Sequence, residues 1–282
     1  MRIMVLGSDG FLGTHVCAEL ETTHRVIRAD LPIIDITNSS ELRTYVDKSD
    51  PEVIVHLAAL TGARTSMIGP LDFSNVNING TINILEICRT VGIRKFVFMS
   101  SLTVHGNVGD NVDESWPINP AHVYGATKAA GEALVRAYSN AYNINSISFR
   151  PNLITGPGKA EDDIIYDFIR SAKENISLKV FGDGLHRRQW THPHDIARAI
   201  MCGIENIETL DGTYCLGSNS MTVFELANEV TKIAGIGNLE YIKPSEQSFN
   251  LSCSSKLFEE KSGWKARIGI SQIIKEVWDD FN

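Results

Sequence analysis

Residues 3–6 form a short apolar run, Ile-Met-Val-Leu, that leads directly into a loop with glycine at positions 7, 10 and 13. A helix-like segment follows the loop and extends to Leu20. Glycine permits a tight turn and close approach to the backbone, and the start of a helix offers free N–H groups and a partial positive charge to a phosphate. The order strand, glycine loop, helix predicts a dinucleotide-binding turn, although the spacing Gly-x-x-Gly-x-x-Gly differs from the common Gly-x-Gly-x-x-Gly. The alternative is an ordinary glycine-rich connection between a strand and a helix.

Four further apolar runs continue this pattern, at 25–29, 53–57, 96–99 and 146–150, and helix-like segments separate them. Strands that alternate with helices predict an α/β fold with a doubly wound parallel sheet, the Rossmann architecture. Ligands of such sheets bind at the carboxyl ends of the strands. We therefore expect the functional residues in the segments that directly follow these runs.

Asp30 ends the second apolar run, 17 residues after Gly13. A carboxylate at this place accepts hydrogen bonds from the adenosine ribose and repels a 2′-phosphate, which favours NAD over NADP. Arg28 lies nearby in the sequence, so NADP is not excluded. Asp35 follows after a short connection, and we expect it near the adenine edge.

Tyr124 and Lys128 lie four residues apart at the start of a predicted helix, in the segment His-Val-Tyr-Gly-Ala-Thr-Lys at 122–128. This spacing places both side chains on one helical face. A nearby ammonium favours the phenolate and lowers a tyrosine pKa toward the range of a general acid or base. The alternative is an amphipathic pair on a solvated helix.

The composition excludes several classes of function. The formal net charge of −8 disfavours a general nucleic-acid or anionic-membrane surface. The five cysteines are widely spaced, which indicates reduced thiols and no disulfide framework. We see no signal peptide or membrane-spanning stretch, and we expect a cytoplasmic protein.

Several motifs together make the chain similar to a known family. They are Gly7 to Gly13, Asp30, the segments 56–59, 77–81 and 100–106, Tyr124 with Lys128, the segments 156–158 and 182–184, Arg188 and Asp195. In this order and approximate spacing they resemble the extended short-chain dehydrogenase/reductase family. The specific resemblance is to its NAD-dependent epimerase/dehydratase branch, which modifies nucleotide sugars.

The resemblance implies roles for individual residues. Tyr124 resembles the family's proton-transferring tyrosine, Lys128 its partner, and Ser101 the hydroxyl that binds the reacting sugar oxygen. The cofactor, NAD, is expected to contact Gly7, Gly10, Phe11, Leu12, Gly13, Asp30, Asp35, Ile36, Leu57, Ala58, Ala59, Asn77, Tyr124 and Lys128. The substrate is expected to contact Thr103, Asn152 and Arg188. The resemblance also implies a homodimer packed through the helices that include Leu71 to Thr90 and Tyr124 to Tyr142.

Departures from the family pattern narrow the reaction. Members that remove water carry Asp and Glu directly after the catalytic hydroxyl residue, whereas this chain has Leu102 and Thr103. A 4,6-dehydratase is therefore disfavoured, which leaves a 4-epimerase or a reductase or dehydrogenase of a nucleotide-linked keto sugar. Cys253 in place of a common aspartate and the shortness of the chain favour the reductase or dehydrogenase. Leu153 stands where an asparagine usually contacts the diphosphate, so a reductase of a small substrate without a nucleotide stays open, as does a non-catalytic dinucleotide-binding sensor.

The chain is expected to form two units. Residues 1–154 with about 189–216 would bind NAD, and about 155–188 with 217–282 would form a smaller substrate-binding α/β domain. His192, His194 and Asp195 are close in sequence, but no third ligand group of suitable type accompanies them. We interpret this segment as a helix start capped by Asp195, and we predict no metal site.

Overall fold

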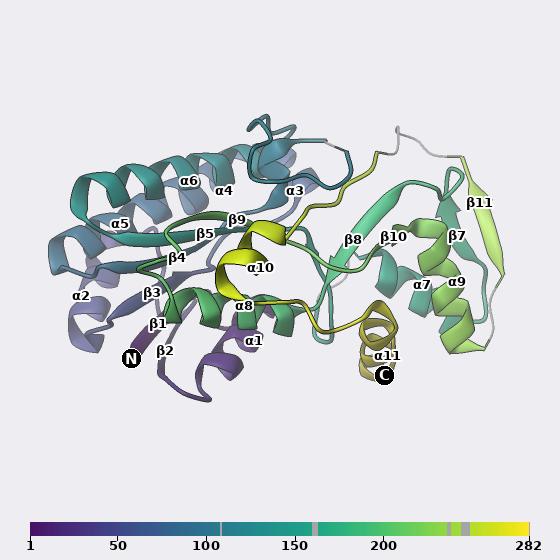
Figure 1. Cartoon of the computed structure of the whole chain (residues 1–282), viewed down its shortest axis with the longest axis horizontal. Coiled ribbons are helices and arrows are strands. Elements are labelled where there is room, and N and C mark those ends of the chain that lie inside the picture. The colour runs from purple at the N-terminus through teal and green to yellow at the C-terminus, as the bar shows by residue number, and fades with distance from the viewer. Residues whose placement is uncertain (108, 160–162, 236–237, 244–248, 282) are drawn as a thin grey trace.

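The computed structural model describes residues 1–107, 109–159, 163–235, 238–243 and 249–281 (Figure 1). The elements of the first half are β1 (Arg2–Leu6), α1 (Phe11–Leu20), β2 (Arg25–Ala29), α2 (Ser39–Ser49), β3 (Val53–His56), α3 (Ala63–Ile68), α4 (Pro70–Ser74), a π-helix (Asn75–Asn79), α5 (Gly80–Val91), β4 (Lys95–Met99), a 3₁₀-helix (Leu102–His105), α6 (Val123–Tyr142) and β5 (Asn145–Pro151). Those of the second half are β6 (Leu153–Ile154), α7 (Ile164–Lys173), β7 (Leu178–Phe181), β8 (Arg187–Thr191), α8 (Pro193–Glu205), β9 (Gly212–Leu216), β10 (Ser220–Thr222), α9 (Val223–Ala234), β11 (Leu239–Ile242), α10 (Lys256–Ser262) and α11 (Ile270–Asp280).

A six-stranded parallel sheet forms the centre of the larger lobe, with the strand order β2-β1-β3-β4-β5-β9. The order reverses between β1 and β3, which is the place where parallel α/β sheets open a ligand crevice. The predicted α/β fold with a doubly wound parallel sheet is therefore confirmed. The segments after β1, β3, β4 and β5 all leave the sheet at the same edge.

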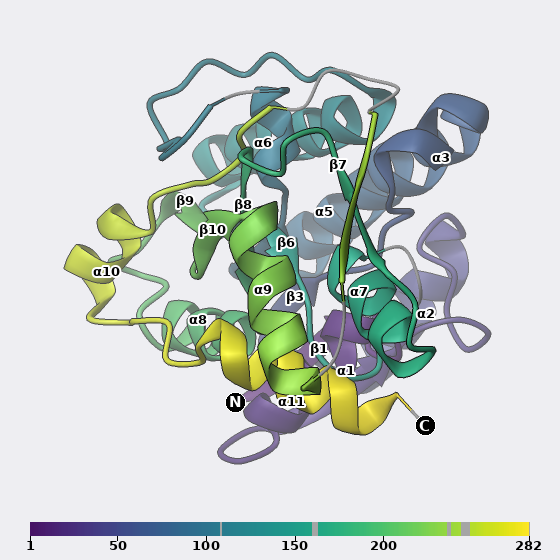
Figure 2. The same ribbon diagram turned by 90° about the vertical axis from the view of Figure 1, so that its right-hand side faces the viewer.

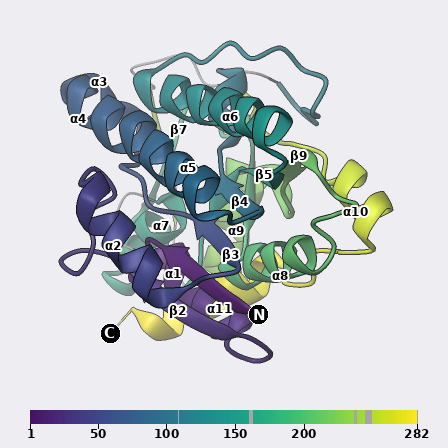
Figure 3. The same cartoon turned by 90° about the vertical axis from the view of Figure 1, so that its left-hand side faces the viewer.

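Helices cover both faces of this sheet (Figure 3). Ile3 and Val5 of β1 belong to the apolar core on the α1 and α8 side, whereas Met4 and Leu6 belong to the core on the α2, α5 and α6 side. This division follows from the alternation of side chains along a strand. Burial on both faces explains why the strands are continuous apolar runs in the sequence.

The second lobe contains a three-stranded sheet, β10-β8-β6, and a two-stranded sheet, β11-β7 (Figure 2). Its core lies among α7, α9 and α11 and includes the fully buried Trp190. The chain then returns to the larger lobe, because Phe258 and Trp264 pack in the core on the α1 and α8 side. The domain boundaries given above stay a prediction.

The start of α8 differs from the expected one. Its N-cap is His192, whose side chain accepts a hydrogen bond from the backbone N–H of His194, and Pro193 occupies the first turn. Asp195 lies inside the helix, where its buried carboxylate accepts hydrogen bonds from the backbone N–H groups of Arg267 and Ile268. The prediction that Asp195 caps the helix is wrong, because its carboxylate is used to hold the C-terminal segment.

Candidate active site

The glycine loop after β1 requires two of its glycines for steric reasons. Gly7 has a φ of +86°, and a Cβ atom there would lie 2.7 Å from the backbone nitrogen of Ala58. A Cβ atom at Gly13 would lie 2.0 Å from the carbonyl oxygen of Gly7. The loop, the start of α1 and the segment after β3 are therefore in direct backbone contact.

The start of α1 suits a phosphate group. Its N-cap is Gly10, and among the described residues no side chain caps the first turn, so the N–H groups of Phe11, Leu12 and Gly13 are open to a ligand. Asp30 lies beside this loop, because its carboxylate accepts hydrogen bonds from the N–H groups of Asp9 at 2.9 Å and Leu31 at 2.8 Å. A dinucleotide needs this combination of bare helix N-terminus and nearby carboxylate.

Asp35 and Ile36 follow β2 and have different surroundings. The exposed Asp35 accepts a hydrogen bond from the N–H of Thr37 at 2.8 Å. Ile36 is buried, and its side chain fills the space over Gly80, where a Cβ atom would lie 2.6 Å from the Ile36 Cδ1. These contacts fix the connection that we expect to border the adenine.

The segment after β3 is held in place by a buried asparagine. The N–H groups of Leu57 and Ala58 both donate to the carbonyl oxygen of Leu6 at 2.9 Å. The Asn77 amide accepts from the N–H of Leu60 at 2.8 Å and donates to the Leu60 carbonyl and to Thr127 Oγ1, both at 3.0 Å. Asn77 thus connects the segment containing Ala58 and Ala59 to α6, and we expect it to affect cofactor binding through that segment.

Ser101, Tyr124 and Lys128 lie together where β4 ends and α6 begins. His122 caps α6 by accepting a hydrogen bond from the N–H of Gly125 at 3.1 Å. A Cβ atom at Gly125 would lie 2.6 Å from the carbonyl oxygen of Thr103, so the start of α6 lies directly against the 3₁₀-helix. This close approach brings the Ser101 hydroxyl near enough to the Tyr124 phenol to affect its ionisation.

Lys128 is 4% exposed, and its ammonium donates to the carbonyl oxygen of Met99 at 2.7 Å. Its Nζ lies 6.0 Å from the centre of the Tyr124 ring. Burial lowers the pKa of Lys128 to about 7, and the negative charge of Glu132 opposes this shift. Burial raises the pKa of Tyr124 to about 12, and the hydrogen bond with Ser101 opposes that shift.

The expected lowering of the tyrosine pKa by the neighbouring ammonium is therefore wrong for this structure. Removal from water disfavours the charged form of both groups, and it is the largest cause of both pKa shifts. The phenol is the predominant form of Tyr124 near neutral pH, while Lys128 titrates close to neutrality.

Arg188 and Asn152 lie on the side of the second lobe. Arg188 donates to the carbonyl oxygen of Phe249, and its guanidinium carbon lies 4.7 Å from the centre of the Phe249 ring. Within the described residues, no ion pair includes Arg188, and burial lowers the pKa of its guanidinium. A half-buried cation in such surroundings is suited to an anionic ligand.

Asn152 has a different environment from the one its sequence position suggests. Its side-chain N–H group donates to the carbonyl oxygen of Leu251 at 2.9 Å and to Gln189 Oε1 at 3.3 Å. The Gln189 amide in turn donates to the carbonyl oxygen of Cys253 at 2.9 Å. Asn152 therefore braces the segment that carries Phe249.

Sequence reasoning missed Phe249 and Gln189. Their contacts join distant parts of the sequence: Phe249 binds Arg188, which is 61 positions away, and Gln189 binds Cys253, which is 64 positions away. A single sequence gives no signal for such a pairing. Only the return of the chain from the second lobe brings these groups together.

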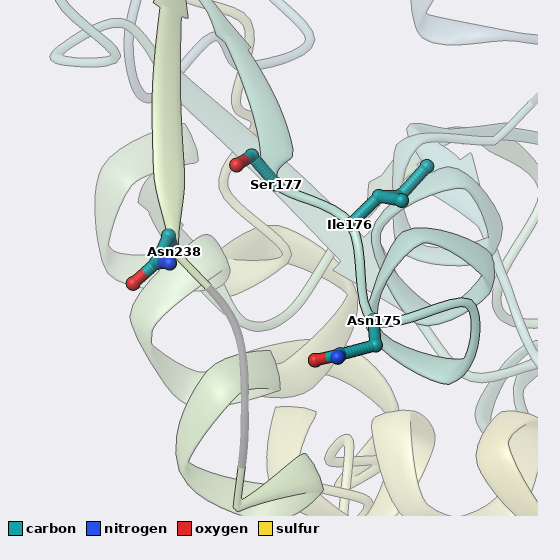
Figure 4. A pocket seen from close by; sticks show the side chains of 4 residues that line it. All are labelled: Asn175, Ile176, Ser177 and Asn238. Atoms are coloured by element: carbon teal, nitrogen blue, oxygen red, sulfur yellow. The ribbon is translucent and has the colours of Figure 1, made fainter.

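A separate cavity of about 330 Å³ lies in the second lobe, lined by Asn175, Ile176, Ser177 and Asn238. Figure 4 shows these side chains on the turn after α7 and at the start of β11. None of the residues predicted to act on cofactor or substrate lines this cavity, so it is distinct from the candidate active site. In the part of the chain that the structure describes, we find no cluster of three or more metal-ligating side chains and no helix with the length and apolar character needed to cross a bilayer.

Comparison with known proteins identifies the family. Residues 3–217 match the family described as the NAD dependent epimerase/dehydratase family. The chain belongs to this family. The predicted resemblance and the predicted NAD dependence are thereby confirmed at the level of the family.

Individual relatives show how widely this family varies. The chain is 31% identical to a putative UDP-glucose 4-epimerase of Methanocaldococcus jannaschii, over 98% of this chain and 96% of the relative. It is also 26% identical to the dTDP-D-glucose 4,6-dehydratase of Mus musculus, over 85% of this chain and 74% of the relative. Among solved structures, the UDP-glucuronic acid 4-epimerase from Bacillus cereus, in complex with UDP-glucuronic acid and NAD, matches with a TM-score of 0.90 at 23% identity, over 99% of this chain and 98% of that chain. The structural match shows the fold, whereas the family is identified by the sequence match over residues 3–217.

Proposed function

We propose that this member of the family is an NAD-dependent 4-epimerase of a nucleotide-activated sugar, which transfers hydride at the C4 hydroxyl or keto carbon. The observation that carries this proposal is the meeting of the Ser101 hydroxyl, the Tyr124 phenol and the Lys128 ammonium at the sheet edge where the glycine loop also ends. A non-catalytic sensor of a dinucleotide has no evident need for these three groups together.

The residues present fit NAD, because the close backbone contacts of Gly7 and Gly13, the bare start of α1 and the Asp30 carboxylate form its expected cradle. NAD, when bound, supplies the acceptor and donor of hydride. Lys128 would bind the cofactor ribose.

Tyr124 is the proposed acid and base. As the phenolate, which is its minor form near neutral pH, it takes the proton of the sugar hydroxyl when the carbon is oxidised. As the phenol it returns a proton to the keto oxygen when the carbon is reduced. Ser101 would donate a hydrogen bond to the same sugar oxygen and hold it against Tyr124. Epimerisation requires the keto sugar to turn within the site between these two steps, so that hydride returns to the opposite face.

Elimination of water is disfavoured by the residues after Ser101. Leu102 is apolar and 1% exposed, and the Thr103 hydroxyl donates to Ser101. Neither side chain supplies the carboxylic acid or carboxylate that a 4,6-dehydratase would need at these two positions.

The alternative function is reduction or dehydrogenation of a keto sugar. In the sequence analysis, the shortness of the chain is an argument for this alternative. The putative UDP-glucose 4-epimerase of M. jannaschii aligns over 96% of its own length and 98% of this chain, so the two chains have similar lengths. The length of the chain therefore gives the alternative little support.

The substrate class is tested with a panel of UDP-, dTDP-, GDP- and CDP-sugars incubated with the purified 282-residue chain and NAD. An epimerase interconverts two sugars without net formation of NADH, whereas a dehydrogenase accumulates NADH in proportion to product. Absence of turnover with every sugar, despite bound NAD, would contradict the proposal. Calorimetric titration with free UDP, dTDP and GDP separates a nucleotide-sugar enzyme from a reductase of a small substrate, because only the former binds a free nucleotide.

We also propose a homodimer that packs through α5 and α6. These helices lie side by side on one face of the main sheet (Figure 3). The neighbouring α4 exposes Leu71, which is 82% exposed in the single chain. Sedimentation velocity tests this arrangement, and a monomer at micromolar concentration would contradict it.

A further inference from the structure

A buried ion pair lies directly beneath the candidate catalytic residues. Arg150 donates to both oxygens of Glu132, with Nε to Oε1 at 2.8 Å and Nη2 to Oε2 at 2.6 Å. The two side chains are 4% and 3% exposed. The Ser100 hydroxyl donates to the same Glu132 Oε1 at 2.5 Å.

A histidine completes the cluster from the other side. His105 Nδ1 lies 3.0 Å from the carbonyl oxygen of Pro117, and its Nε2 lies 3.1 Å from Arg150 Nη1. A carbonyl can only accept a hydrogen bond, so Nδ1 carries the proton and Nε2 accepts from the guanidinium. The neutral His105 therefore accepts a hydrogen bond from the Arg150 guanidinium and adds no charge next to the ion pair with Glu132.

Each member of the cluster is adjacent to a candidate site residue. Glu132 lies one helical turn after Lys128, and Ser100 directly precedes Ser101. His105 ends the 3₁₀-helix that contains Thr103, and Arg150 lies two residues before Asn152. The cluster thus joins α6, the end of β4, the 3₁₀-helix and β5, which are the elements that carry the proposed acid, base and substrate contacts.

Stability alone is a weak reason for this pair. Removal of two charges from water costs free energy that their attraction often only offsets, and apolar replacements of similar volume are frequently neutral or stabilising. What an apolar pair would not supply is a fixed negative charge near Lys128. Glu132 is the group whose charge favours the ammonium form of that lysine.

The other groups that face Lys128 and the pair do not replace this charge. His56, on β3, is fully buried and is held neutral because burial lowers its pKa to about 3. Tyr124 on α6 is a neutral phenol, and Met99 on β4 contributes its carbonyl oxygen. The charges of Cys215 on β9 and of Glu114 act on Arg150, where they favour the charged guanidinium.

We propose that Glu132 is a positioning residue, held by Arg150, whose carboxylate acts on Lys128 one helical turn away and fixes α6 against Ser101. This inference deepens the proposed function, on which its catalytic meaning rests. In this proposal Glu132 acts on the reaction through Lys128 and does not contact the substrate.

The test is an NMR titration of the Lys128 side chain in the 282-residue protein with isotope-labelled lysine, and the Lys128 signal is assigned by its loss in Lys128→Met. In Glu132→Gln, which keeps the shape but loses the charge, the pKa of Lys128 should fall by about one unit or more. The matched control is Glu86→Gln, since Glu86 also binds α6, through the Tyr138 hydroxyl at 2.5 Å, but lies at the helix surface. The control should leave the Lys128 titration unchanged, and an unchanged titration in Glu132→Gln would overturn the proposal.

A second variant covers the case in which Glu132→Gln does not fold. Glu132→Leu combined with Arg150→Met replaces the pair by apolar side chains and is expected to fold. The pKa of Lys128 should again fall, and a wild-type value would overturn the proposal. Because this readout needs no turnover, failure of every nucleotide sugar as substrate would contradict the proposed function and leave the result for Glu132 standing. With an active substrate, the pH profile of turnover should shift in the same direction as the Lys128 titration.

Discussion

The Thr103 hydroxyl donates a 2.9 Å hydrogen bond to the hydroxyl oxygen of Ser101. The backbone N–H of Thr103 points to the same oxygen at 3.3 Å. Ser101 therefore receives hydrogen bonds from the 3₁₀-helix, and its own proton remains for Tyr124 or for a substrate oxygen. A threonine predicted from the sequence to contact the substrate thus orients the proposed catalytic hydroxyl.

Replacement of Tyr124 by phenylalanine removes the proposed acid and base with little change in shape. We expect turnover to fall by about a hundredfold to ten-thousandfold, while NAD affinity stays nearly unchanged. Steady-state kinetics and calorimetry measure the two effects. Tyr142→Phe, near the far end of the same helix, is the control, and full activity of the Tyr124 variant would exclude tyrosine from proton transfer.

Lys128 should make the stability of the protein depend on pH. Its pKa is lowered by burial to about 7, and the unfolded value is near 10.4. Between these values the unfolded chain binds more protons than the folded chain, so the free energy of unfolding should rise with pH. From about pH 7 to about pH 9, denaturant unfolding should show a gain on the order of 2 kcal/mol in the wild type relative to Lys128→Met. If the free energy of unfolding had the same pH dependence in the two proteins, the pKa of Lys128 would not be lowered by burial.

Arg188 should contribute to nucleotide-sugar affinity and not to NAD affinity. Loss of its guanidinium in Arg188→Gln is expected to weaken nucleotide-sugar binding by about tenfold to a hundredfold. Arg187→Gln serves as the control, because Arg187 is engaged with the Ser220 carbonyl oxygen at 2.8 Å. Equal effects of the two substitutions in calorimetric titrations would argue against a specific phosphate contact at Arg188.

Gly13→Ala tests the close packing of the glycine loop. The new methyl group would lie 2.0 Å from the Gly7 carbonyl oxygen, so the loop must move and the free energy of unfolding should drop by about 2–3 kcal/mol. A Cβ atom at Gly269 would have no neighbouring atom within 4 Å, so Gly269→Ala should hardly change the free energy of unfolding. Thermal unfolding with and without NAD measures both the loss of stability and the loss of binding. A Gly13 variant as stable as the Gly269 variant would contradict the tight contact between the loop and α1.

Asp30 should set the preference for NAD. Its carboxylate is fixed by the N–H groups of Asp9 and Leu31, so a 2′-phosphate would meet a negative charge that cannot easily turn away. We expect NAD to bind at least about tenfold more tightly than NADP, and Asp30→Ser to reduce this ratio. Fluorescence titration with both cofactors checks the ratio. Tighter binding of NADP by the wild type would refute the assignment.

Local patterns in the sequence determined the sheet and much of its ligand edge. Residues 3–6 and the glycines that follow are contiguous, so their strand, turn and helix could be recognised without knowledge of any distant contact. The capping of α9 by Thr222 and Glu225 is similarly local, because residues three positions apart at a helix start satisfy each other's backbone N–H groups. The sequence also placed Tyr124 and Lys128 on one helical face, because the helical period alone fixes that relationship.

Tertiary structure decided what surrounds these residues. Burial reversed the expected direction of the Tyr124 pKa, since the loss of water around a side chain depends on elements far away in sequence. It also turned Asp195 from an expected helix cap into an acceptor for the C-terminal segment. The pairs Arg188 with Phe249 and Glu132 with Arg150 form only when separate strands and helices pack, and a single sequence carries no periodicity that links them. Spacing along the chain determines local geometry, whereas solvation and charge pairing are set by the complete fold.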